Sequence, residues 1–138
     1  MDKKYIVVVQ CDIVMERCSG YGCERAFNER TGGFSDYPED TKYRTIYMTC
    51  GGCCGRGVMR KLNDLTRMLD KEENVQKESI VVHFSSCITK DNYHAPTCPH
   101  LDYLKTLIGD KMSLDIVEAT HISKQSKELR EKGLYNIQ

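Results

Sequence analysis

The sequence has no excess of charge of either sign. Its 138 residues include 20 acidic and 20 basic side chains, so the formal net charge is zero. Proteins that bind nucleic acids or anionic membranes through a general electrostatic field carry an excess of positive charge. We therefore expect neither a nucleic acid nor a membrane as a partner. The sequence identifies no protein partner.

Long apolar runs are also missing. The longest one near the start, Ile6 to Val9, is too short for the apolar region of a signal peptide or for a membrane span. We accordingly expect a cytoplasmic protein. The chain contains no internal repeat, low-complexity tract or interdomain linker, and its length is typical of one domain. Residues 1–138 are thus predicted to form a single domain.

Two enzyme signatures are absent as well. Gly20-Tyr21-Gly22 lacks the third glycine of a dinucleotide-binding loop and lies ten residues beyond the preceding predicted strand. No combination of serine, histidine and aspartate is typical of a hydrolase. The sequence therefore identifies no substrate and leaves open whether the protein catalyses a reaction.

Cysteine, in contrast, is abundant. The chain has eight cysteines, and its strand and helix patterns are sufficient for a hydrophobic core without disulfide bonds. In a reducing compartment, clustered cysteines more often bind metal or take part in redox chemistry than stabilise the fold as disulfides. The cysteines are therefore candidate functional residues.

Three of these cysteines lie in the central motif Cys50-Gly51-Gly52-Cys53-Cys54-Gly55. The two-residue spacer between Cys50 and Cys53 allows both sulfurs to reach one metal ion or to close a small disulfide. The glycines allow a tight backbone turn. A helix predicted to follow would place its positive N-terminal end near the thiols, which favours the thiolate form.

Apolar runs and amphipathic stretches alternate along the chain. The apolar runs predict four strands, at residues 5–9, 43–48, 79–85 and 113–119. Helices are predicted around residues 24–30, from Gly57 with an apolar stripe of Val58, Leu62, Leu65 and Leu69, from Cys98-Pro99 to Gly109, and at residues 122–132. This alternation predicts an α/β fold with an open, mainly parallel four-stranded sheet flanked by helices. A flavodoxin-like or Rossmann-like strand order of 2-1-3-4 is the first choice.

In such a sheet, the cysteines gather at one edge. Cys11, Cys50 and Cys87 each follow a predicted strand, and ligands of open parallel sheets bind beyond the carboxyl ends of the strands. With neighbouring strands about 4.8 Å apart, these groups should lie within about 15 Å of one another. The same edge should carry Cys53 and Cys98, the Cys18/Cys23 loop, and His121 after the fourth strand. His83, inside a buried strand, is instead predicted to be a hydrogen-bonded core residue.

Seven segments together resemble the CGGC domain family of small bacterial and archaeal proteins. They are Cys11, Cys18-Ser19-Gly20-Tyr21-Gly22-Cys23 with Ala26-Phe27-Asn28, Gly33-Phe34, Cys50-Gly51-Gly52-Cys53, Ser86-Cys87-Ile88, Cys98-Pro99-His100 and Thr120-His121. The resemblance covers nearly the whole chain and implies metal binding without an established reaction. Two positions depart from the family pattern: Cys54 stands where proline is frequent, and Ala119 where a glycine usually precedes Thr-His.

Three functions remain open at this point. The first is a cysteine-rich metal site that holds zinc or an iron–sulfur cluster. Zinc is slightly favoured, because the cysteine spacing is unlike that of ferredoxins. The second is a metal-free thiol–disulfide oxidoreductase that uses Cys50 and Cys53. The third is a carrier or sensor for a soft metal ion.

Overall fold

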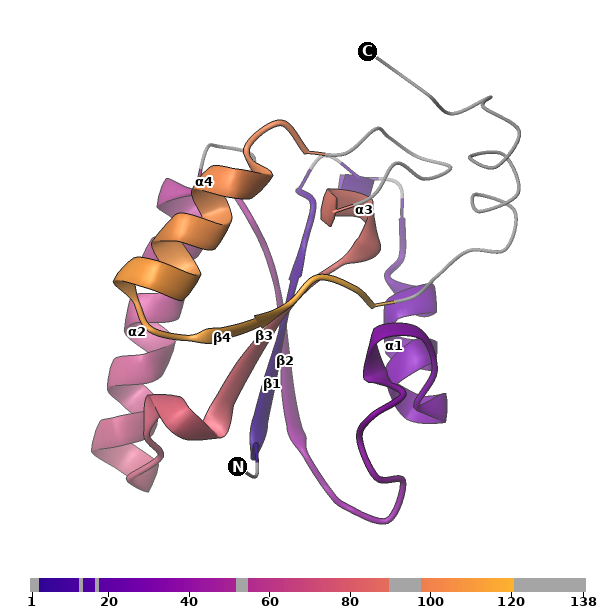
Figure 1. Ribbon diagram of the computed structural model, residues 1–138, viewed down its shortest axis with the longest axis horizontal. Helices are drawn as coiled ribbons and strands as arrows, with labels where there is room; N and C mark the ends of the chain where they lie inside the picture. Colours follow the sequence, from indigo (N-terminus) through magenta and orange to yellow (C-terminus); the bar gives the residue numbers. More distant parts are fainter. Residues whose placement is uncertain (1–2, 13, 17, 52–54, 90–97, 121–138) are drawn as a thin grey trace.

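The computed structural model describes residues 3–12, 14–16, 18–51, 55–89 and 98–120. Its sheet has four parallel strands in the order β2-β1-β3-β4 (Figure 1). The strands are β1 (Tyr5–Gln10), β2 (Arg44–Thr49), β3 (Ile80–Phe84) and β4 (Asp115–Val117). The predicted fold class and strand order are thus confirmed.

Strand β1 lies at the centre of the sheet. Its Val7 pairs with Ile46 of β2 on one side and with Val82 of β3 on the other. All six residues of β1 and all five of β3 are buried. A strand covered on both faces reads as a continuous apolar run, which is why these two strands were visible in the sequence.

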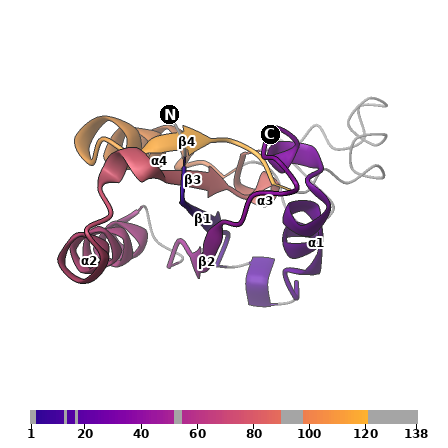
Figure 2. The same ribbon diagram turned by 90° about the horizontal axis from the view of Figure 1, so that it is seen from below.

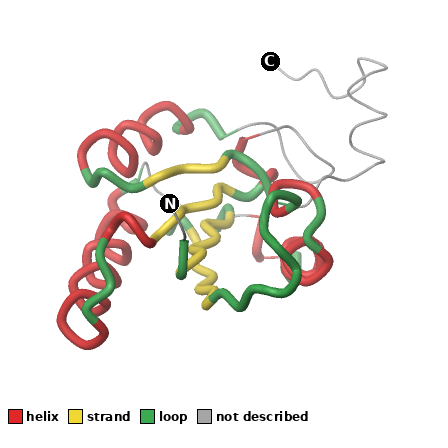
Figure 3. The backbone as a smooth tube through the Cα atoms, turned by 60° about the horizontal axis from the view of Figure 1, so that its bottom comes forward, coloured by secondary structure: helices red, strands yellow, loops and turns green. Residues whose placement is uncertain are grey.

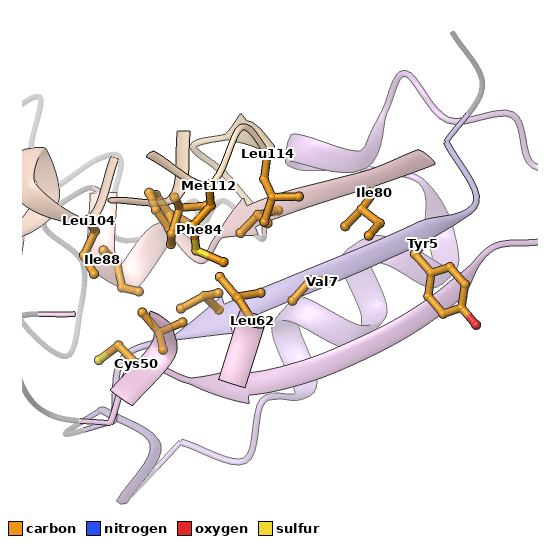
Figure 4. Close-up of a cluster of buried hydrophobic side chains, with 14 of the residues drawn as sticks. Tyr5, Val7, Cys50, Leu62, Ile80, Phe84, Ile88, Leu104, Met112 and Leu114 are labelled. Atoms are coloured by element: carbon orange, nitrogen blue, oxygen red, sulfur yellow. The ribbon is translucent and has the colours of Figure 1, made fainter. Parts of the chain in front are cut away.

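One face of the sheet packs against the long helix α2 (Arg56–Glu73), and α4 (Leu101–Lys105) lies on the same side (Figures 1 and 2). The predicted stripe of α2 supplies this contact: Val58, Leu62 and Leu69 are buried, and Leu65 packs against them. The side chains of Tyr5, Val7 and Val9 meet the stripe from β1. Figure 4 shows this core running from Tyr5 at one end to Cys50 at the other.

The opposite face packs against α1 (Tyr21–Glu29) and the 3₁₀ turn η2 (Gly32–Phe34) (Figure 2). Ile6 and Val8 of β1 point to this face, as the two-residue period of a strand requires. Phe34 and Ala26 complete the buried cluster. Each face of the sheet is therefore covered by helical structure, as expected for an α/β fold.

The helix after Cys98 differs from the prediction. It begins at Leu101 rather than at Pro99, and it passes through Gly109 as the π-helical turn η4 (Thr106–Lys111). A Cβ at Gly109 would lie 3.2 Å from Ile116 Cδ1, so this glycine permits a close approach to β4 instead of ending the helix. Strand β4 is also shorter than predicted, with three residues.

A short helix, α3 (Ser86–Thr89), follows β3 and was not predicted from the sequence. It lies at the end of the sheet where β1 and β3 finish, away from the N-terminus (Figure 1). Figure 3 shows the strands of the sheet in yellow with helices in red around them. Two single turns, η1 (Val14–Glu16) and η3 (Lys77–Ser79), complete the described elements. The helix predicted at residues 122–132 lies outside the described residues.

His83 is fully buried, as predicted for a core residue. Its Nδ1 lies 2.9 Å from the carbonyl oxygen of Ala119, and its Nε2 lies 2.7 Å from the hydroxyl of Tyr37. Since the carbonyl can only accept, Nδ1 carries the proton and the Tyr37 hydroxyl donates to Nε2. Burial lowers the pKa of His83 and raises the pKa of Tyr37 to about 12, so both groups are neutral.

Candidate metal centre

Three cysteines, each just beyond a different strand, lie at the carboxyl edge of the sheet. Cys11 directly follows β1, Cys50 directly follows β2, and Cys87 lies in α3 just after β3. Because β1 runs between β2 and β3, Cys11 occupies the middle of this row. The backbone N–H of Cys50 donates to Gln10 O at 2.9 Å, and that of Ser85 donates to Val9 O at the same distance. These bonds tie the first residues beyond the strands to β1.

Cys50 is the most buried of the described thiols, with 7% of its surface exposed. It belongs to the hydrophobic core formed with α2. Figure 4 places it at the end of that core with its sulfur directed away from Leu62. Its side chain thus lies at the boundary between the core and the edge of the sheet.

Cys87 is held by two hydrogen bonds. Its sulfur lies 2.8 Å from the hydroxyl of Ser85, and the backbone amide of Cys11 bonds to the same sulfur. Burial raises the pKa of Cys87 to about 11, and the neighbouring Cys11 and Cys23 thiols add to this effect. The metal-free side chain is therefore a protonated thiol at neutral pH.

Cys98 joins the same edge from the segment before α4. Its backbone N–H donates to Ile88 O at 2.8 Å, which places it next to α3. The backbone N–H of His100 donates to Cys98 Sγ at 3.4 Å. Burial raises the pKa of Cys98, with smaller contributions from Cys50 and Cys11. Cys98 is thus close enough to both of these cysteines to interact with them electrostatically.

Cys23 reaches the edge from α1, on the other face of the sheet. Its sulfur lies 3.2 Å from Thr120 Oγ1, and Cys23 contributes slightly to the raised pKa of Cys87. Cys18, in the loop before α1, is half-buried and donates its backbone N–H to Val14 O. Among the described residues, no hydrogen bond connects Cys18 to another thiol. Among the predicted residues, the described structure therefore brings Cys11, Cys50, Cys87, Cys98 and Cys23 to one region.

The remaining predicted ligands, Cys53 and His121, lie outside the described residues, as does Cys54. Within the described part of the chain, no three side chains of His, Cys, Asp or Glu form a group that could hold a metal ion. Cys11, Cys18, Cys23, Cys87 and Cys98 are thiols rather than members of disulfides.

Sequence reasoning missed the hydroxyl groups beside the thiols. The Ser86 N–H donates to Thr120 Oγ1 and the Thr120 N–H donates to Ser86 Oγ, both at 3.2 Å. This reciprocal pair joins the segments that follow β3 and β4. The sequence offers one indication of these groups, namely that they lie close to a cysteine. This holds for Thr49, Ser85 and Ser86.

The described helices include none that is long and apolar enough to cross a membrane.

The fold and the edge together define a class of protein: a parallel α/β domain with cysteines that follow several strands at its carboxyl edge. The chain belongs to the CGGC domain family, whose model matches residues 5–121. Membership of this family suggests a metal-binding role. No curated protein and no solved structure matched the chain.

Proposed function

We propose that this protein binds a soft metal centre, a zinc ion or an iron–sulfur cluster, through cysteine thiolates at the carboxyl edge of its sheet. Cys11, Cys50, Cys87 and Cys98 would contribute from the described residues. Metal binding would have to draw their sulfurs closer together, because no three of the described side chains form a group that could hold an ion in this structure. Cys53 would complete the set from the central motif. Cys18, Cys23 and His121 are further candidates, whose participation depends on the number of metal ions bound.

The observation that carries this proposal is the position of Cys11, Cys50 and Cys87 just beyond three neighbouring strands, at one edge of the sheet. Backbone amides directed toward two of the sulfurs support it. The amides of Cys11 and His100 point at the sulfurs of Cys87 and Cys98. Such N–H···S bonds stabilise a thiolate, which is the form that binds metal. In the metal-free protein, burial outweighs them and keeps both pKa values high. A bound cation would reverse this balance, because it stabilises the deprotonated ligand directly.

Zinc remains slightly favoured over a cluster. Four thiolates would make a closed structural zinc site, and three with one water would leave a position open for chemistry. A [4Fe–4S] cluster also takes four cysteines, so the ligand set alone does not separate the two.

Anoxic purification followed by elemental analysis tests the proposal. Stoichiometric zinc identifies a zinc site, and brown protein absorbing at about 400 nm identifies a cluster. The same measurements on Cys50→Ser and Cys87→Ser should show reduced metal content. Wild-type protein that contains neither metal, and that takes up neither zinc nor reconstituted iron and sulfide, would refute the proposal.

The thiol–disulfide oxidoreductase is less well supported. Thioredoxin-like folds include antiparallel strands, whereas all described strand pairs here are parallel. Catalytic turnover of a model disulfide that requires Cys50 and Cys53, in protein without metal, would nevertheless replace the metal-binding proposal with this one.

A further inference from the structure

The chain segments that carry Cys11 and Cys50 are joined by a side-chain hydrogen bond. Thr49 Oγ1 donates to Asp12 Oδ1 at 2.9 Å. Thr49 directly precedes Cys50, and Asp12 directly follows Cys11. The bond therefore links the immediate neighbours of two cysteines that lie 39 positions apart in the sequence.

Lys61 extends this contact to helix α2. Its Nζ donates to Thr49 O at 3.1 Å and to Thr49 Oγ1 at 3.3 Å. An ammonium group has no acceptor, so the Thr49 hydroxyl accepts from Lys61 and gives its own proton to Asp12. The resulting chain of hydrogen bonds runs from Lys61 through Thr49 to Asp12, with a cation at one end and a carboxylate at the other. Both hydrogen bonds of the Thr49 hydroxyl are therefore charge-assisted.

Backbone pairing between β1 and β2 reaches Thr49 and Cys50 but does not reach Asp12. The register of β1 and β2 ends with Gln10 opposite Thr49, followed by the bond from Cys50 N to Gln10 O. Beyond these residues, one segment enters η1 and the other leads toward α2. The side chains of Asp12, Thr49 and Lys61 thus join the segment after β1, the last residue of β2 and helix α2.

We propose that these three residues, the Asp12–Thr49–Lys61 clasp, position Cys11 and Cys50 to bind a common metal centre. This inference rests on the proposed function. Zinc–sulfur bonds are about 2.3 Å long, so two sulfurs that share an ion tolerate little relative displacement. Ligands are held to about 0.5 Å in well-organised sites by supporting side chains of this kind. Losing such support typically lowers metal affinity by about tenfold or more.

Zinc affinity, measured by competition with a chromogenic chelator, tests the clasp. Thr49→Val removes the hydroxyl with little change in shape, and Asp12→Ala removes its acceptor. Each should weaken zinc binding by about tenfold. Thr49→Ser and Asp12→Asn keep the hydroxyl and an acceptor oxygen, so both should bind zinc with nearly wild-type affinity.

Thr45→Val is the matched control. Thr45 is a half-buried threonine of the same strand, opposite Ile6 and remote from the carboxyl edge. It should leave zinc affinity unchanged. Absorption spectra with Co²⁺ add a readout of ligand geometry: Thr49→Val should change the thiolate-to-cobalt bands, whereas Thr45→Val should not.

The outcomes separate this inference from the proposed function. Wild-type zinc affinity and an unchanged cobalt spectrum in Thr49→Val would overturn the clasp while leaving the metal site intact. An equal loss of affinity in Thr45→Val would also overturn it, because the effect would then be general destabilisation of β2. If the wild-type protein binds neither Zn²⁺ nor Co²⁺, the proposed function fails and the clasp fails with it.

Discussion

At the scale of single residues, burial sets the protonation of the edge thiols. Ser85 and the Cys11 amide both lower the pKa of Cys87, yet desolvation is larger and brings it to about 11. The cysteines could be selected from the sequence because clustered cysteines have few roles in a reducing compartment and because several of them directly follow predicted strands. Their hydroxyl partners could not be selected in this way, because serine and threonine occur in many environments. Only the interatomic distances in the structure show which of them contact a cysteine.

These raised pKa values predict that zinc affinity increases with pH. At pH 6.5 to 7.5, Cys87 and Cys98 are protonated in the metal-free protein, since the pKa of each lies above the ordinary thiol value. Each thiol that becomes a ligand must release its proton, so the apparent affinity should rise about tenfold per pH unit for each thiol. Chelator competition at pH 6.5, 7.0 and 7.5 measures this. An affinity independent of pH would mean that neither thiol is a ligand.

The buried His83 predicts a second pH effect, on stability. Its pKa is lowered in the folded protein, whereas the unfolded chain has the ordinary value of 6.5. As the pH falls from 6.5 through the folded pKa, the unfolded chain binds a proton that the folded protein does not. The free energy of unfolding should then decrease by up to about 1.4 kcal/mol per pH unit.

Urea unfolding at pH 7.5, 6.5 and 5.5 checks this second effect. Above pH 6.5 the contribution of His83 to the free energy of unfolding is fully present. The free energy of unfolding should therefore stop increasing with pH in that range. A His83→Gln variant has no imidazole to titrate and should lose this part of the pH dependence. An identical dependence in wild type and variant would assign it to other groups.

At the scale of elements, the sequence was most informative where burial is one-sided or complete. The stripe of α2 and the apolar runs of β1 and β3 are direct consequences of their surroundings, so their pattern could be read. The helix after Cys98 could not be delimited in this way. Gly109 is typical of a helix end, but here its missing side chain admits Ile116, a tertiary contact without a local signal.

Helix α2 offers a matched pair of substitutions. Leu62 is fully buried against the sheet, whereas Met68 is 39% exposed on the same helix. Leu62→Ala should lower the free energy of unfolding by about 2–5 kcal/mol through lost burial and a cavity. Met68→Ala should change it by less than about 1 kcal/mol. Chemical denaturation of the metal-free protein compares them, and equal effects would contradict the assignment of the buried face.

At the scale of the whole molecule, the strand order determines which cysteines meet. Right-handed crossovers restrict the possible orders of four such strands, and the first choice among them, 2-1-3-4, is confirmed. That order places Cys11 between Cys50 and Cys87. The sequence could not show how the sulfurs are held, because that depends on backbone amides at the ends of separate elements. The proposed site therefore follows from topology first and from local hydrogen bonding second.

The central claim is that cysteines from separate strands bind the same metal centre. Its most direct test is residue-resolved alkylation of the native protein, with and without bound metal, quantified by mass spectrometry. The account predicts that metal protects Cys11, Cys50 and Cys87 together and that its removal exposes them together to the reagent. Protection of Cys50 without any change at Cys11 and Cys87 would contradict a shared site.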